Sequence, residues 1–305
     1  MIAFVFPGQG SQHAGMGKDL VDNFPVARAV FEEANDALGF DLATLCFNGP
    51  DEDLKLTTNT QPAILTTSIA ALKVLEQETG LVPAYVAGHS LGEYSALVCA
   101  GGLTFADAVR TVRKRGAFMQ EAVPVGVGAM AAVIGLDAAL LDEVCATAAA
   151  GEVVSPANFN SPGQVVIAGH ATAVERAMSL ALGKGAKRAL RLPVSAPFHC
   201  SLMTPAGERL DKVLAAIEPG ALRLPVVTNV EAAPNADASR IRHLLVAQVS
   251  APVRWDDSVV RMAELGVERF IEIGPGKVLC GLIKRIARHV SAANIEDCAS
   301  LQKII

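Results

Sequence analysis

The fold is decided by the stretch Tyr85-Val86-Ala87-Gly88-His89-Ser90-Leu91-Gly92. An apolar, strand-like run leads into the glycines, and a helix-like run leads away from them. Gly88 and Gly92 allow a turn that is too tight for side chains at those two positions. A G-x-S-x-G sequence between a strand and a helix is typical of a nucleophile elbow, which exposes the serine Oγ. The stretch therefore predicts an α/β fold with a reactive Ser90, against the alternative of a plain strand-to-helix turn.

Short apolar runs alternate with helical patterns on both sides of this stretch. Strands are expected at Ile2–Phe6, Tyr85–Ala87, Pro225–Thr228 and Phe270–Ile273, and helices at Pro62–Glu78, Leu91–Cys99 and Phe105–Glu121. Strands that alternate with helices predict a mainly parallel sheet.

The segment 125–192 has a different pattern. Strands are expected at 128–134, 153–158, 164–168 and 187–192, with helices at 137–149 and 172–182 and a turn at 160–163. This βαββαβ order predicts a ferredoxin-like subdomain. We therefore expect a discontinuous α/β core at 1–124 and 193–305, interrupted by the small subdomain at 125–192.

Composition narrows the class of protein. The chain has 305 residues and a net charge of −5, without the basic excess that nucleic-acid binders usually carry. Its six cysteines form no C-x-x-C pair, so we expect no metal site and a reducing compartment. We see no signal peptide and no apolar run long enough to span a membrane, which favours a cytoplasmic protein without membrane contact.

A serine nucleophile needs a general base, and six histidines are available. Adjacent side chains diverge on a sharp elbow, so His89 is expected to support the turn by packing or hydrogen bonding. His199 follows Pro197-Phe198 where the chain returns from the subdomain to the core. Loops that return to a sheet often carry catalytic groups, which makes His199 the leading candidate. The sequence leaves the others open: His13, His170, His243 and His289.

Several separated motifs resemble one family. They are Phe6-Pro7-Gly8-Gln9-Gly10-Ser11-Gln12, Gly88 to Tyr94, Arg113 to Gln120, Pro197-Phe198-His199 and Gln248 to Trp255. In this order they resemble the malonyl-CoA:acyl carrier protein transacylases over nearly the whole chain. The resemblance implies a hydrolase-like α/β core with a ferredoxin-like insert. It also implies malonyl transfer through a malonyl-serine for fatty acid biosynthesis, with no cofactor besides malonyl-CoA and phosphopantetheinylated acyl carrier protein.

The resemblance also implies roles for individual residues. Ser90 matches the nucleophile and His199 the base, while Arg115 matches the arginine that binds the malonyl carboxylate. Gln9 and Leu91 match the residues whose backbone N–H groups form the oxyanion hole. The remaining position is Gln248, which matches the residue whose backbone carbonyl holds the imidazole, so we expect no triad carboxylate.

Phe198 has two interpretations. Phenylalanine at this position resembles the malonyl-selecting pattern of polyketide acyltransferases, because its bulk leaves little room for an α-methyl group. The alternative is simple core packing. A basic cluster in the subdomain is equally open, since it could steer an acidic carrier or form an ordinary solvated surface. It consists of Lys184, Lys187, Arg188 and Arg191.

Rival functions remain at this point. A carrier protein of polyketide or malonate decarboxylase metabolism could replace the fatty acid carrier. A serine thioesterase would usually show an acid partner and a histidine near the C-terminus, and His289 lacks such a setting. A non-catalytic carrier-binding subunit would not need Ser90, His199 and Arg115 together. The family resemblance implies partners in acyl carrier protein and a coenzyme A thioester, and a monomer.

Overall fold

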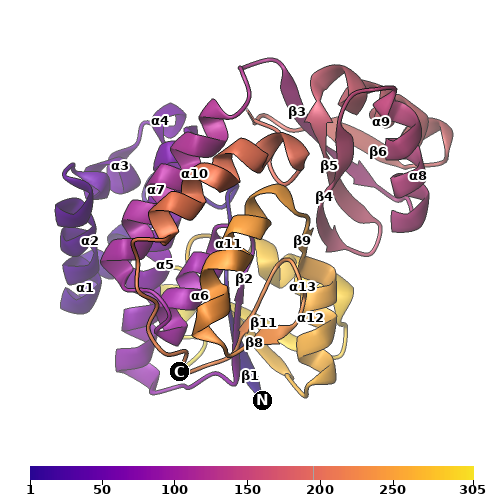
Figure 1. Cartoon of the computed structure of the whole chain (residues 1–305). Coiled ribbons are helices and arrows are strands. Elements are labelled where there is room, and N and C mark those ends of the chain that lie inside the picture. The colour runs from indigo at the N-terminus through magenta and orange to yellow at the C-terminus, as the bar shows by residue number, and fades with distance from the viewer. Residues whose placement is uncertain (195) are drawn as a thin grey trace.

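The computed structural model describes residues 1–194 and 196–305, and two β-sheets organise them into a mixed α/β fold (Figure 1). The strands of the first sheet, in spatial order, are β11 (Ser291–Ile295), β10 (Arg269–Ile273), β1 (Ile2–Phe6), β2 (Tyr85–Gly88), β7 (Val226–Val227) and β8 (Pro234–Asn235). Each adjacent pair is parallel except β7 with β8. The sheet is thus mainly parallel, as the alternation of apolar runs and helical patterns predicts.

Strand β1 explains why the central strands are apolar throughout. Phe4 and Phe6 point into one buried cluster, and Ala3 and Val5 point into another on the opposite face. Successive side chains of a strand alternate between faces, so a sheet covered by helices on both sides needs apolar residues at every position.

Helices from most of the chain build these two faces. The first face is covered by α1 (Lys18–Asn23), α2 (Pro25–Leu38), α3 (Leu42–Asn48), α4 (Asp51–Lys55), α5 (Thr57–Thr79), α6 (Gly92–Ala100), α7 (Phe105–Glu121), α10 (Thr204–Leu214), α11 (Ile241–Ser250) and α14 (Cys298–Leu301). The second face is covered by α12 (Trp255–Glu264) and α13 (Val278–Ile286). Short 3₁₀ turns at Ser201–Met203 and Ala238–Arg240 precede α10 and α11.

The second sheet lies beyond the carboxyl ends of the parallel strands (Figure 1). Its spatial order is β6 (Arg188–Arg191), β3 (Gly128–Ile134), β5 (Gln164–His170), β4 (Val154–Ser161) and β9 (Val253–Arg254). The first four strands pair antiparallel, and α8 (Ala138–Ala149) and α9 (Ala171–Gly183) pack on one face. The chain order is therefore βαββαβ. Strand β9 was not foreseen: it comes from the C-terminal part of the chain and pairs in parallel with β4.

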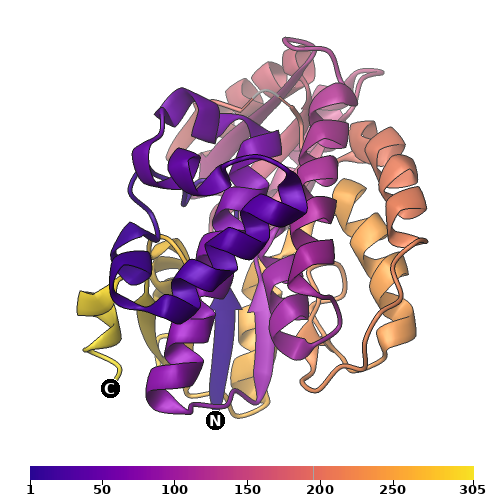
Figure 2. The same ribbon diagram turned by 90° about the vertical axis from the view of Figure 1, so that its left-hand side faces the viewer.

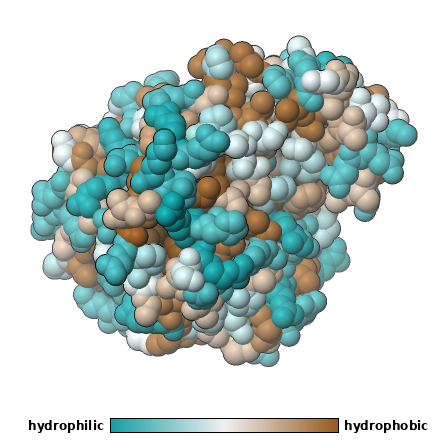
Figure 3. All heavy atoms as spheres, viewed as in Figure 1, coloured by the Kyte–Doolittle hydropathy of each residue, from teal (hydrophilic) through white to brown (hydrophobic). Residues whose placement is uncertain are grey.

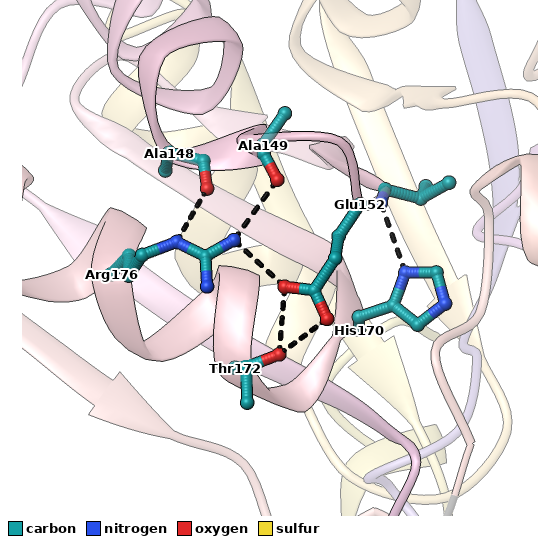
Figure 4. Close-up of polar contacts among 7 residues, drawn as sticks. Ala148, Ala149, Glu152, His170, Thr172 and Arg176 are labelled. Carbon is teal, nitrogen blue, oxygen red and sulfur yellow. Dashed lines mark hydrogen bonds and ion pairs between the residues drawn. The ribbon is translucent and has the colours of Figure 1, made fainter.

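A polar cluster joins α8 and α9 on this sheet (Figure 4). Arg176 of α9 donates hydrogen bonds to the carbonyls of Ala148 and Ala149 at the end of α8. Its guanidinium also forms an ion pair with Glu152 at 2.7 Å, and Thr172 donates to the same carboxylate. A cation at a helix C-terminus satisfies carbonyls that have no intrahelical partner, so Arg176 ends α8 and ties it to α9.

Two predicted boundaries differ from the structure by more than two residues. Helix α5 begins at Thr57 rather than Pro62, because a proline in its second turn removes one intrahelical hydrogen bond and the buried α5–α7 packing outweighs that loss. The turn expected at 160–163 is shorter, since β4 continues to Ser161 before β5 starts at Gln164.

Both ends of the chain lie at the end of the molecule that faces away from the second sheet (Figures 1 and 2). Polar residues cover much of the face in Figure 3, and hydrophobic residues gather at its top, over the connection between α7 and β3. Val125 and Val127 of that connection are exposed. None of the helices in the described ranges is long and apolar enough to cross a membrane.

Candidate active site

Ser90 lies on a sharp turn between β2 and α6, with a φ of 52°. A positive φ is costly for any residue other than glycine, and such strain collects at functional sites. The flanking glycines are required by close backbone contacts. A Cβ on Gly88 would lie 1.9 Å from the carbonyl carbon of Gly92, and one on Gly92 would lie 2.1 Å from the carbonyl oxygen of Phe6. The local sequence therefore fixes an elbow that presents the Ser90 side chain at the carboxyl end of β2.

His199 faces Ser90 from the connection that follows the second sheet. The Ser90 Oγ and His199 Nε2 atoms are 2.7 Å apart, and His199 Nδ1 is 2.8 Å from the backbone oxygen of Gln248. A carbonyl oxygen can only accept, so Nδ1 carries the proton and Nε2 is free to accept from the hydroxyl. Burial, and secondly the Arg115 cation, lower the pKa of His199 to about 3. The imidazole is therefore neutral, as a general base must be.

Arg115 reaches the same serine from α7, and its side chain is almost completely buried. The guanidinium Nη1 donates to Gln61 Oε1 at 2.8 Å. Nη2 donates to Gln248 Oε1 at 3.0 Å and to Ser90 Oγ at 3.1 Å. All three acceptors are neutral, and burial lowers the pKa of the guanidinium. Buried charges are normally paired, so this cation is suited to an anionic group on a ligand beside Ser90.

The predicted oxyanion donors lie on either side of the serine. Gln9 follows β1, and Leu91 precedes the first turn of α6. Within residues 1–194 and 196–305, neither backbone N–H is bonded to a backbone carbonyl. The Leu91 amide lies at the N-terminus of α6, where free amides attract negative charge, and Gln9 lines the same cavity as Ser90 and Leu91.

A cavity of about 110 Å³ joins these groups between the two sheets. Gln9, Ser90, Leu91 and Arg115 line it from the first sheet and its helices, and Met130 and Asn158 line it from the second sheet. Its wall also includes the predicted site residues His89, Phe198 and His199. Gln248 is not among the lining residues, but its side-chain oxygen accepts from Arg115 and its backbone oxygen lies 2.8 Å from His199 Nδ1.

His89 does not point at Ser90 Oγ as a base would. Its Nε2 is 2.8 Å from Asn160 Oδ1, and its ring centroid is 5.8 Å from that of Trp255. Burial lowers the pKa of His89. A hydrogen-bonded, packed imidazole of this kind fits the supporting position expected for it.

Sequence reasoning missed three buried side chains that hold the site together. Gln61 accepts from Arg115, Asn229 accepts from the Ser90 N–H of the elbow, and Glu93 accepts from the backbone N–H of Asn229. Asn229 follows β7 at the carboxyl edge of the parallel sheet, where site residues are expected, and that signal was available. Glu93 belongs to the motif Gly88 to Tyr94, but the motif assigns it no role. Gln61 directly precedes the predicted helix start at Pro62, so the prediction did not place it on α5. Among the described residues, no group of three His, Cys, Asp or Glu side chains could hold a metal ion.

This fold and this site define a class, the acyltransferases, and comparison with known proteins agrees. The model of the acyl transferase domain family matches residues 3–305. The malonyl CoA-acyl carrier protein transacylase of Salmonella typhimurium is 55% identical over 98% of this chain and 97% of that protein. The crystal structure of an acyl carrier protein S-malonyltransferase from Vibrio cholerae superimposes with a TM-score of 0.97. It is 52% identical and covers 100% of this chain and 99% of its own.

A further solved structure shows a malonyl-transacylase in complex with a type II PKS acyl-carrier protein. It is 53% identical, with a TM-score of 0.97 over 99% of this chain and 98% of its own. The chain belongs to the malonyl CoA-acyl carrier protein transacylase family.

Proposed function

We propose that this chain moves a malonyl group from malonyl-CoA to the phosphopantetheine thiol of acyl carrier protein, through a malonyl ester on Ser90. The observation that carries the proposal is the buried Arg115 guanidinium, which donates to Ser90 Oγ and to the neutral side-chain oxygens of Gln61 and Gln248. A cation in this position matches an acyl group that ends in a carboxylate. Family membership supports the same activity.

In the first half-reaction, Ser90 Oγ attacks the thioester carbonyl while His199 Nε2 takes the hydroxyl proton. The carbonyl oxygen becomes an oxyanion that the amides of Gln9 and Leu91 stabilise, by about 3 kcal/mol for each donor. The C–S bond then breaks, and His199 returns its proton to the departing CoA sulfur. The products are free CoA and a malonyl-serine.

In the second half-reaction, the thiol of the carrier's phosphopantetheine attacks the malonyl ester. His199 takes the thiol proton and then gives it to Ser90 Oγ as the ester bond breaks. Two half-reactions through one covalent intermediate predict ping-pong kinetics. A second hollow of about 160 Å³ adjoins the site through Gln9 and His89, and it supports a path for the pantetheine arm of either thioester.

Fatty acid biosynthesis is the pathway that this family's activity serves, and we assign the chain to it. Carriers of polyketide or malonate decarboxylase metabolism are the alternative partners, and one solved relative is a malonyl-transacylase in complex with a type II PKS acyl-carrier protein. A serine thioesterase is the less favoured activity, because water rather than a thiol would then attack the malonyl ester.

We also propose a division of the chain into two parts. Residues 1–124 and 193–305 form a hydrolase-like core, and 125–192 form a ferredoxin-like subdomain. The strand order β6-β3-β5-β4, with α8 and α9 on one face, supports the ferredoxin-like subdomain. We further propose a cytoplasmic monomer that needs no cofactor beyond its two substrates and contacts neither nucleic acid nor membrane.

Release of CoA from malonyl-CoA tests this function when it is followed with and without acyl carrier protein. The proposal expects one equivalent of CoA per enzyme without the carrier and continuous release with it. Steady release without the carrier would identify a hydrolase instead. The fatty acid and polyketide carriers, supplied separately at equal concentration, would show which pathway's carrier is served.

A further inference from the structure

The backbone of Ser90 is held by two side-chain amides from distant parts of the chain. Asn229 Oδ1 accepts from the Ser90 N–H at 2.7 Å, and Asn229 Nδ2 donates to the Gly88 carbonyl at 2.7 Å. Gln248 Nε2 donates to the Ser90 carbonyl at 3.0 Å. The strained elbow is therefore bridged on its N–H side by Asn229 and on its C=O side by Gln248, which lie 139 and 158 residues from Ser90 in the sequence.

Both bridging residues meet at one carboxylate oxygen. Glu93 Oε2 accepts from the backbone N–H of Asn229 at 2.9 Å and from Gln248 Nε2 at 2.9 Å. Glu93 lies in the first turn of α6, three residues after Ser90, and its side chain is buried. Burial raises the pKa of Glu93 to about 7, so the contribution of this oxygen is geometric: one buried acceptor shared by two donors fixes their mutual position.

Gln248 extends this connection to the other groups of the site. Its backbone oxygen accepts from His199 Nδ1, and its side-chain oxygen accepts from Arg115. Gln248 alone therefore links the Glu93 side chain to His199 and to Arg115. Asn229 and Gln248 each link it to the Ser90 backbone, but Glu93 does not line the cavity beside Ser90.

We propose that Glu93 is a positioning residue, which holds the Ser90 elbow in register with His199 through Asn229 and Gln248. The inference rests on the proposed acyl transfer at Ser90. It assigns a role to a carboxylate in a site whose imidazole is bound by a carbonyl rather than by an acid. Glu93 acts on the nucleophile's backbone, so its effect does not depend on which acyl group is transferred.

The test measures the first-order rate of CoA release at saturating donor, with malonyl-CoA and with acetyl-CoA, for folded enzyme. Glu93→Leu removes both hydrogen bonds, and displacement of the elbow is expected to slow both reactions by about 30- to 100-fold. Glu93→Gln can place its amide oxygen where Oε2 lies and accept from both donors, so it is expected to recover most of the rate. Asn229→Ala cuts only the elbow branch and is expected to slow both donors by about tenfold.

Glu272→Leu is the matched control for stability. Glu272 is likewise buried and accepts from two backbone amides, those of Leu279 and Cys280, at the start of α13. This variant is expected to lower the melting temperature as Glu93→Leu does, while acylation by the folded enzyme stays within about threefold of wild type, as for a structural change away from the site.

Three results would overturn the role of Glu93. The first is a loss confined to malonyl-CoA, which would place its action on Arg115 alone. The second is a lower melting temperature with an unchanged acylation rate in the folded Glu93→Leu and Asn229→Ala enzymes. The third is an equal rate loss in Glu93→Gln and Glu93→Leu. Failure of the wild-type enzyme to release CoA would instead refute acyl transfer itself, so the two failures are distinguishable.

Discussion

Replacement of Arg115 tests how the site recognises its acyl group. A malonyl carboxylate bound by the guanidinium gains two charge-assisted hydrogen bonds, each contributing about 1.5–3 kcal/mol. Arg115→Ala therefore removes about 3–6 kcal/mol of binding that acetyl-CoA never receives. Since 1.36 kcal/mol corresponds to a factor of ten, kcat/KM for malonyl-CoA is expected to fall by about 10²–10⁴.

The same substitution also removes the contact between the guanidinium and Ser90 Oγ, which is present for every donor. We therefore expect acetyl-CoA to lose at most about 10- to 100-fold, the value of one hydrogen bond from a charged donor, and malonyl-CoA to lose the carboxylate contribution in addition. Arg115→Lys is the matched control, because it keeps the charge without the two-pronged geometry and is expected to give an intermediate loss. The assay is CoA release with each donor over a range of concentrations. An equal loss for malonyl-CoA and acetyl-CoA would refute recognition of the carboxylate by Arg115.

Three other predictions concern selectivity, pH and the carrier. Phe198→Ser opens space beside His199. The ratio of kcat/KM for methylmalonyl-CoA to that for malonyl-CoA is therefore expected to rise by about tenfold, the value of one methyl group in an apolar pocket. An unchanged ratio would show that Phe198 serves only in packing. The His199 pKa is lowered from 6.5 to about 3, so the unfolded state binds one more proton than the native state between these values. Stability from the neutral imidazole is therefore complete above pH 6.5 and is lost as the pH falls toward 3. Denaturant unfolding of wild type relative to His199→Gln should show wild type losing about 2–3 kcal/mol more between pH 7 and 4.5, and parallel curves would contradict the shift. Charge reversal at Lys187 and Arg188 is expected to slow transfer to the carrier and to weaken its salt dependence, with CoA release from malonyl-CoA unchanged; the same salt dependence in the variant and wild type would remove this cluster from docking.

The elbow and the strands around it were predictable because their signals are local. Strand β1 and helix α7 have the bounds that the periodicity predicts, and Ser90 lies at the predicted turn. The pairing of Ser90 with His199 spans 109 residues. Residue types and loop position made His199 the leading candidate, and the family resemblance separated it from the other histidines.

The supporting network could not be predicted in the same way. The hydrogen bonds of Glu93 with Asn229 and Gln248 join residues 136 and 155 positions apart, and a buried glutamate leaves no periodic signal. Strand β9 has only two residues, and its pairing with β4 depends on how the whole C-terminal part of the chain packs. Such features depend on tertiary contacts that propensity does not encode.

Mass spectrometry of the intact protein after brief exposure to malonyl-CoA tests the central claim most directly. We expect a single malonyl adduct, which peptide mapping places on Ser90. We also expect the adduct to be absent from Ser90→Ala and to be discharged by the thiol of acyl carrier protein. An adduct on another residue, or no adduct while malonyl is still transferred to the carrier, would contradict the covalent role of Ser90.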